Sequence, residues 1–96
     1  MRLRDRLYEL RDEIQRVAAE SGARDVRVFG SVARGDENEK SDIDFLVALD
    51  PGRSLLDLAR LELSLERLLG RAVDVSTEAG LREPIRAAAL RDSIRV

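Results

Sequence analysis

Two short segments of the chain carry side chains that suit the binding of phosphate and metal ions. The segment GSVARGDENEKSDIDFLV, residues 30–47, begins with Gly30 and Ser31 directly after an apolar run. After ten further residues, Asp42 and Asp44 open a second apolar run, and Asp74 lies inside a third, AVDVS. A phosphate-binding turn and three carboxylates on neighbouring strands are what two-metal phosphoryl transfer requires. The spacing therefore predicts phosphoryl-transfer chemistry.

The glycine–serine pair suits a place where phosphate comes close to the backbone. Gly30 follows an expected strand and precedes a helical turn, whose start leaves backbone N–H groups free for an anion. Glycine permits close approach, and the Ser31 hydroxyl can donate to a phosphate oxygen. The structural alternative is a common turn in which Ser31 is only a helix N-cap. Arg34 could reach the same phosphate, or could pair with Asp36 or Glu37.

Asp42 and Asp44 stand two residues apart, so on a strand both side chains leave the same face. Their Cα atoms would then be roughly 6.5–7 Å apart. Side chains at that spacing can share two metal ions about 3.5–4 Å apart. The alternative is a pair of solvated acids that protects a strand edge. Two such acids at the end of a buried strand repel each other unless a cation or protons intervene, and this pair alone does not decide between the two alternatives.

Asp74 lies between Val73 and Val75 in a short apolar run. A carboxylate inside a strand is costly unless something satisfies it. The alternative is that Asp74 faces solvent on an open side of the sheet. If its strand is a parallel neighbour of the strand that follows Asp42, then Asp42, Asp44 and Asp74 form one cluster.

The composition restricts the chemistry to carboxylates. The chain has no cysteine and no histidine, so thiolate nucleophiles, disulfides and imidazole bases are excluded. Oxygen ligands favour magnesium, calcium or manganese. A calcium EF-hand is excluded because Ser41 and Val47 occupy the positions that require glycine and glutamate. No Gly-Lys-Ser/Thr follows the glycines, so a Walker-type phosphate loop is excluded as well.

Charge and hydropathy bear on partners and location. The 17 basic and 19 acidic residues leave a net charge of −2, and no basic run resembles a nucleic-acid-binding arm. The first ten residues, MRLRDRLYEL, lack an apolar core of signal-peptide length, and no segment is apolar enough to span a membrane. We therefore expect a cytoplasmic protein that binds neither membrane nor nucleic acid directly.

The elements that must position these residues begin with an amphipathic helix. Apolar residues at spacings of three and four predict a helix over residues 2–21, which ends at Gly22. A short strand is expected over 25–29, then one helical turn over 31–34 that Gly35 ends. The polar residues 36–41 predict a loop, and residues 43–49 predict a buried strand.

The second half of the chain predicts a helix, a strand and a helix. Residues 50–52 form a turn, and Ser54 with Asp57 resembles a capping box at the start of a leucine-rich helix that Gly70 closes. A third strand is expected over 72–76, and a last helix runs from about Pro84 to Asp92. Residues 93–96 could form strand or tail. We expect one α/β domain over residues 1–96, with a three-stranded mixed sheet packed against helices.

Taken together, Gly30-Ser31, Asp42-x-Asp44 and the later strand Asp74 resemble the nucleotidyltransferase superfamily typified by DNA polymerase beta. GSVARG and SDIDFLV look like the motifs of its minimal branch, the MNT proteins, often encoded beside a HEPN-domain partner as toxin–antitoxin pairs. The resemblance covers most of the chain and implies the small nucleotidyltransferase fold. It departs at Val32, where the minimal branch often has arginine.

The resemblance implies roles for individual residues. Asp42, Asp44 and Asp74 would be the catalytic, metal-binding residues that hold two Mg²⁺ ions, with Asp74 helping to deprotonate the attacking hydroxyl. Gly30 and Ser31, with Arg34 beside them, would bind the phosphates of ATP. Attack on the α phosphate would transfer AMP and release pyrophosphate.

The resemblance also implies a partner: a HEPN ribonuclease toxin, silenced by AMP transfer to one of its tyrosines in a hetero-oligomer. Exposed faces of the leucine-rich helices are candidates for docking, although each leucine stripe is more simply explained as core. The alternatives are a non-catalytic antitoxin that masks its partner by binding, and nucleotidyl transfer to a small molecule or an RNA end.

Overall fold

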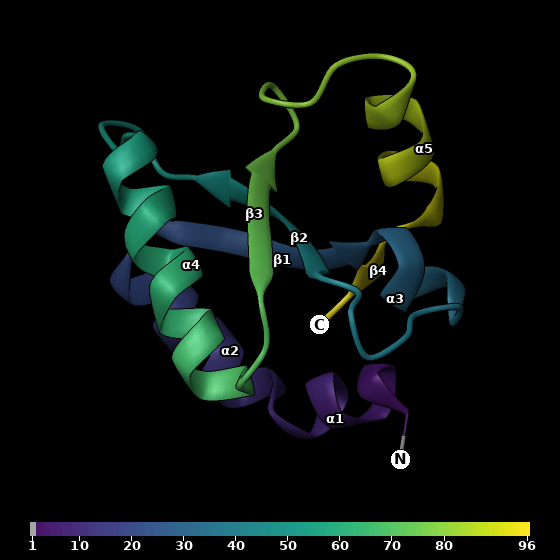
Figure 1. Ribbon diagram of the computed structural model, residues 1–96. Coiled ribbons are helices and arrows are strands. Elements are labelled where there is room, and N and C mark those ends of the chain that lie inside the picture. The colour runs from purple at the N-terminus through teal and green to yellow at the C-terminus, as the bar shows by residue number, and fades with distance from the viewer. Residues whose placement is uncertain (1) are drawn as a thin grey trace.

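The computed structural model describes residues 2–96 as a mixed sheet with helices on both faces (Figure 1). The predicted α/β class is confirmed. The elements, in chain order, are α1 (Leu3–Glu9), α2 (Arg11–Glu20), β1 (Ala23–Phe29), α3 (Gly30–Arg34), β2 (Ile43–Leu49), α4 (Leu55–Leu69), β3 (Val73–Thr77), α5 (Ile85–Asp92) and β4 (Ile94–Arg95).

The sheet has four strands in the order β3-β2-β1-β4, so the expected three-stranded sheet is wrong by one strand. β1 pairs antiparallel with β2 and β4, whereas β2 and β3 are parallel. The added strand is the segment that the sequence left open between strand and tail. It pairs at Ile94 with Val28, and the Arg95 guanidinium donates to Asp25 at 2.7 Å. Two residues are too few for a periodic signal, so only the pairing with β1 defines this strand.

The predicted first helix over residues 2–21 is wrong as one continuous helix. It is divided at Leu10, whose φ of −93° and ψ of 9° interrupt the helical backbone between α1 and α2. The two halves contact different parts of the fold: Arg4 in α1 donates to the Ala33 carbonyl in α3, while α2 packs on β1. The predicted apolar stripe holds across the break, since Leu7 and Ile14 are both buried.

The alternation of side chains along β2 separates two cores. Ile43, Phe45 and Val47 belong to the main core beneath α2 and α4. Leu46 points the other way, into a smaller cluster that includes Ala89 of α5. Figure 1 shows α2 and α4 together on one side of the sheet and α5 on the other. Because Asp44 shares the parity of Leu46, it lies on the α5 face.

The leucine-rich helix α4 begins and ends as the sequence predicts. Ser54 and Asp57 form the expected capping box, and Gly70 closes the helix in the left-handed region at φ 68°. Its stripe is core, since Leu61 and Leu65 are fully buried. The strand that follows starts at Val73, one residue later than expected.

Within residues 2–96, no helix combines the length and hydrophobicity needed to cross a lipid bilayer.

Candidate active site

Asp44 and Asp74 are paired directly across the parallel strands β2 and β3. The condition that the sequence left open, parallel pairing of these strands, is therefore met, and it places the two carboxylates side by side on the α5 face. Asp42 lies one residue before β2 and is exposed, at the end of the loop that enters the strand. The structure thus brings the three predicted acids to one end of the sheet.

The electrostatics of Asp44 reflect this crowding. Burial raises the pKa of the Asp44 carboxyl above its ordinary value of 3.8, and the neighbouring charges of Asp74 and then Asp42 raise it further. The Arg34 guanidinium acts in the opposite direction and lowers this pKa. A half-buried carboxylate beside two others favours the binding of a cation or a proton at this position.

Gly30 lies in contact with the same carboxylate. The preceding residue, Phe29 in β1, pairs with Asp44 in β2. Gly30 is the first residue of α3 and has a φ of +71°. A Cβ built on Gly30 would collide with Oδ2 of Asp44. A glycine is therefore required here both for the left-handed backbone and for the close approach. The turn that offers backbone N–H groups and the acid that would hold a metal share one surface.

Ser31 is the second residue of α3, and the alternative that it caps the helix is wrong. The N-cap position is Phe29, and no side chain caps α3. The Ser31 hydroxyl is thus not committed to helix capping. Arg34, at the last turn of α3, pairs with Asp36 at 3.2 Å, as one of its sequence alternatives expected.

A cavity of about 240 Å³ adjoins this turn, between α3 and α5. Its lining combines the turn at Gly30 with side chains of α5: Phe29, Gly30, Arg34, Ile85, Ala88, Ala89 and Asp92. The sequence analysis did not include α5 in the site. No periodic or motif signal connects residues 85–92 with residues 30–34, and only the packing of α5 on the sheet brings them together.

The donors at this end of the sheet fit a magnesium site. All three are carboxylates, which Mg²⁺ prefers, and their mutual repulsion is relieved by a cation. Across residues 2–96, no three His, Cys, Asp or Glu side chains already stand in a metal-binding arrangement. Asp42, Asp44 and Asp74 would therefore have to turn inward from their present positions to share an ion.

Comparison with known proteins decides the family. A nucleotidyltransferase domain model matches residues 7–96. The chain belongs to the nucleotidyltransferase family. A relative from Methanocaldococcus jannaschii, provisionally assigned as a protein adenylyltransferase, is 38% identical over 90 residues, which span 94% of this chain and 97% of that one.

Solved structures share the nucleotidyltransferase fold. One, provisionally described as a minimal nucleotidyltransferase, superposes with a TM-score of 0.85 at 48% identity and covers 97% of this chain and 95% of its own. A toxin–antitoxin complex with AMP-PNP contains a chain with a TM-score of 0.74 at 17% identity, covering 88% of this chain and 69% of that one. At that identity, the second likeness shows the fold alone.

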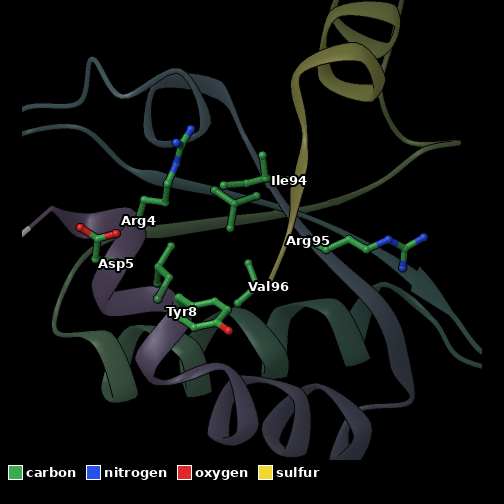
Figure 2. Close-up of a pocket in the computed structure, with 8 residues that line it drawn as sticks. Arg4, Asp5, Tyr8, Ile94, Arg95 and Val96 are labelled. Carbon is green, nitrogen blue, oxygen red and sulfur yellow. The ribbon is translucent and has the colours of Figure 1, made fainter.

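A second cavity of this nucleotidyltransferase lies away from the acids. It measures about 210 Å³ and is framed by Arg4, Asp5 and Tyr8 of α1 and by Ile94 to Val96 at the C-terminal end (Figure 2). Val28 lines it from the face opposite Asp44. None of the six predicted site residues lines this cavity.

Arg71 is a residue near the site that sequence reasoning missed. It lies between α4 and β3, and its guanidinium donates to the carbonyls of Asn38 and Ser41 at 2.8 and 2.6 Å. The loop before β2 is therefore tied to the start of β3 immediately beside Asp42. Such charge-assisted bonds are stronger than neutral ones, so they restrain the backbone that carries the first acid.

Arg71→Ala is expected to lower nucleotidyl transfer by about ten-fold, within the range seen when supporting contacts of metal ligands are lost. The physical reason is that the loop before Asp42 loses two hydrogen bonds, which span 33 and 30 residues of sequence. Steady-state rates at several Mg²⁺ concentrations measure the effect. Arg82→Ala is the control, because Arg82 is exposed and its side chain makes no hydrogen bond or ion pair within residues 2–96. Equal rates for the two variants would contradict the role of Arg71.

The raised pKa of Asp44 predicts how metal-free stability depends on pH. A carboxyl with a raised pKa binds its proton more tightly in the folded than in the unfolded chain. Its contribution to the free energy of unfolding is therefore greatest below pH 3.8 and is lost as the pH rises through the raised folded pKa. Urea unfolding without metal, wild type against Asp44→Asn, should show the variant gaining relative stability across this window. A difference that does not vary with pH would contradict the prediction.

Proposed function

We propose that this nucleotidyltransferase transfers AMP from Mg²⁺-bound ATP to a tyrosine hydroxyl of a HEPN ribonuclease toxin and thereby acts as its antitoxin. The observation that supports it best is the contact between Gly30 and Asp44, with Asp74 paired to Asp44 across the parallel strands. This geometry would join a phosphate-binding turn and the metal-binding carboxylates in a single site.

Each residue has a defined task in the proposed reaction. Backbone N–H groups at Gly30 and Ser31 bind the β and γ phosphates, and the Arg34 guanidinium adds positive charge beside them. Asp42 and Asp44 would hold two Mg²⁺ ions, and Asp74 would complete one of the two sites. When bound, Mg²⁺ neutralises the charge on the phosphates and lowers the pKa of the attacking hydroxyl.

The bond changes balance as follows. The acceptor oxygen forms a bond to the α phosphorus, and the bond from that phosphorus to the bridging oxygen of the β phosphate breaks. Pyrophosphate leaves, and the proton of the acceptor hydroxyl passes to the Asp74 carboxylate. The rate enhancement comes mainly from positioning and from charge neutralisation, since no side chain forms a covalent intermediate.

A protein acceptor is supported by the surface of α4 and by the relatives. Leu55, Leu56 and Leu63 are 80, 60 and 55% exposed on that helix, which leaves apolar area for a partner. The relative from Methanocaldococcus jannaschii carries a protein adenylyltransferase assignment, and the AMP-PNP complex with the same fold is a toxin–antitoxin pair.

The direct test is incubation with labelled ATP, Mg²⁺ and a HEPN toxin, followed by mass spectrometry of the toxin. A mass increase of one or more AMP units on a toxin tyrosine is expected, and changing that tyrosine to phenylalanine should remove it. Transfer of label to a small molecule or to an RNA end, with none on the toxin, would reject the protein acceptor. No label on any acceptor would reject the enzymatic proposal.

The exposed leucines of α4 also support a second candidate, neutralisation of the toxin by binding alone. The Asp42→Asn/Asp44→Asn double variant separates the two in cells that express the toxin. Protection that is lost while toxin binding persists supports AMP transfer, whereas full protection by the double variant supports masking.

A further inference from the structure

β3 is an edge strand whose free side is occupied by two glutamates of α4. In the sheet order β3-β2-β1-β4, β3 has a single strand neighbour. The backbone N–H of Val73 donates to Oε2 of Glu66 at 3.1 Å, and that of Val75 donates to Oε2 of Glu62 at 3.2 Å. Both bonds are partly buried. The two N–H groups that would otherwise lack a partner at the edge are therefore held by side chains.

The spacing of the two bonds matches the geometry of the two elements. Glu62 and Glu66 are four residues apart on a helix, which is about 6 Å at a rise of 1.5 Å per residue. Val73 and Val75 are two residues apart on a strand, which is about 6.6 Å. Because α4 and β3 run in opposite directions, the later glutamate meets the earlier valine. The pair of bonds therefore acts as a two-point clamp on the strand.

The residue between the two clamped amides is Asp74. Its own carboxylate leaves the opposite face from Val73 and Val75, whose side chains are buried in the main core. The exposed Asp74 side chain has no hydrogen bond or ion pair within the described chain, residues 2–96, so its position depends on the backbone that carries it. Without the clamp, the hydrogen bonds that hold this backbone would come from β2 alone, beside the packing of Val73 and Val75 in the core.

We propose that Glu62 and Glu66 are positioning residues of the active site: they fix the backbone on both sides of Asp74 so that its carboxylate meets Asp44 at a shared metal ion. This inference rests on the proposed role of Asp74 in metal binding. Removal of a group that orients a metal ligand without contacting the metal itself typically lowers the metal affinity by about 10–100-fold. The clamp needs an acceptor oxygen rather than a negative charge, so glutamine is able to replace glutamate.

The test compares three variants with the wild type. Glu62→Ala/Glu66→Ala removes both acceptors, and Glu62→Gln/Glu66→Gln retains an amide oxygen at each position. Glu9→Ala/Glu13→Ala is matched in charge to the first variant and alters exposed glutamates whose side chains make no hydrogen bond or ion pair across residues 2–96. Amide hydrogen exchange at Val73 and Val75, Mn²⁺ affinity measured from broadening of the Asp44 and Asp74 amide signals, and transfer kinetics are recorded for each.

The alanine pair is expected to exchange the Val73 and Val75 amides about 10–100-fold faster, as the loss of a bond to a charged acceptor implies. Its Mn²⁺ affinity and kcat should fall about ten-fold, while the KM for ATP changes less than two-fold. The glutamine pair and the control should match the wild type. If the alanine pair does not fold, the single variants Glu62→Ala and Glu66→Ala carry the same comparison.

Two results would overturn the clamp. One is faster amide exchange with unchanged Mn²⁺ affinity, which would leave the glutamates a purely structural role. The other is a glutamine pair as impaired as the alanine pair, which would assign the effect to charge. Absence of AMP transfer by the wild type would instead reject the proposed function, because the Mn²⁺ comparison does not depend on an acceptor.

Discussion

Asp44→Asn is expected to reduce AMP transfer by more than about 100-fold, since a catalytic metal supplies several kcal/mol of charge stabilisation. Asparagine keeps the size of the side chain and one oxygen, but it removes the negative charge that would bind Mg²⁺. Asp44 is the only one of the three acids that touches Gly30 and neighbours Asp74 directly. Loss of its charge would therefore affect the proposed metal-binding and phosphate-binding parts of the site together.

Urea unfolding distinguishes a loss of activity in Asp44→Asn from misfolding of the variant. Burial and two neighbouring carboxylates raise the pKa of Asp44, so its ionised form is unfavourable in the metal-free fold. The variant should therefore unfold at an equal or higher urea concentration than the wild type at pH 7 without metal. Asp12→Asn, an exposed change on α2, serves as the charge-matched control and should keep full activity. If Asp44→Asn retained most of the activity, Asp44 would not be a metal-binding residue.

Gly30→Ala is expected to lose AMP transfer by at least about ten-fold and to lower the free energy of unfolding by about 1–2 kcal/mol or more. Alanine at φ +71° carries the cost of a left-handed backbone, and its Cβ occupies space held by Oδ2 of Asp44. Either the carboxylate moves or the turn opens, and both change the geometry between phosphate and metal. Urea unfolding and steady-state rates measure the two effects.

Gly52→Ala is the matched control. Gly52 has φ +87°, so alanine there carries a similar backbone cost, but no atom lies within 4 Å of the added Cβ. The two variants should therefore lose comparable stability from the backbone, while only Gly30→Ala loses activity. Equal activity in both would show that the contact between Gly30 and Asp44 does not matter for transfer.

Much of the fold could be predicted because local chemistry decides it. The capping box at Ser54, the left-handed Gly70 and the leucine stripe specify α4 without any tertiary information. The β-branched and aromatic run from Ile43 to Leu49 specifies β2 in the same way. The break at Leu10 could not be predicted, because the apolar period continues across it and only the different packing partners of α1 and α2 require it.

For the candidate site too, some features follow from local sequence and others from tertiary packing. The residue types, their spacing and the absence of histidine and cysteine predict that the chemistry of this protein uses carboxylates and a phosphate-binding turn. These are properties of short segments and of composition, so the chain order alone contains them.

Only the tertiary structure decided which groups meet. Parallel pairing of β2 with β3 places Asp74 beside Asp44, although the two residues are thirty positions apart in the sequence. The same packing brings Arg71 to the loop before Asp42 and Glu62 and Glu66 to the backbone around Asp74. Strand order and helix packing minimise the free energy of the whole chain, and no local pattern records which distant segments become neighbours.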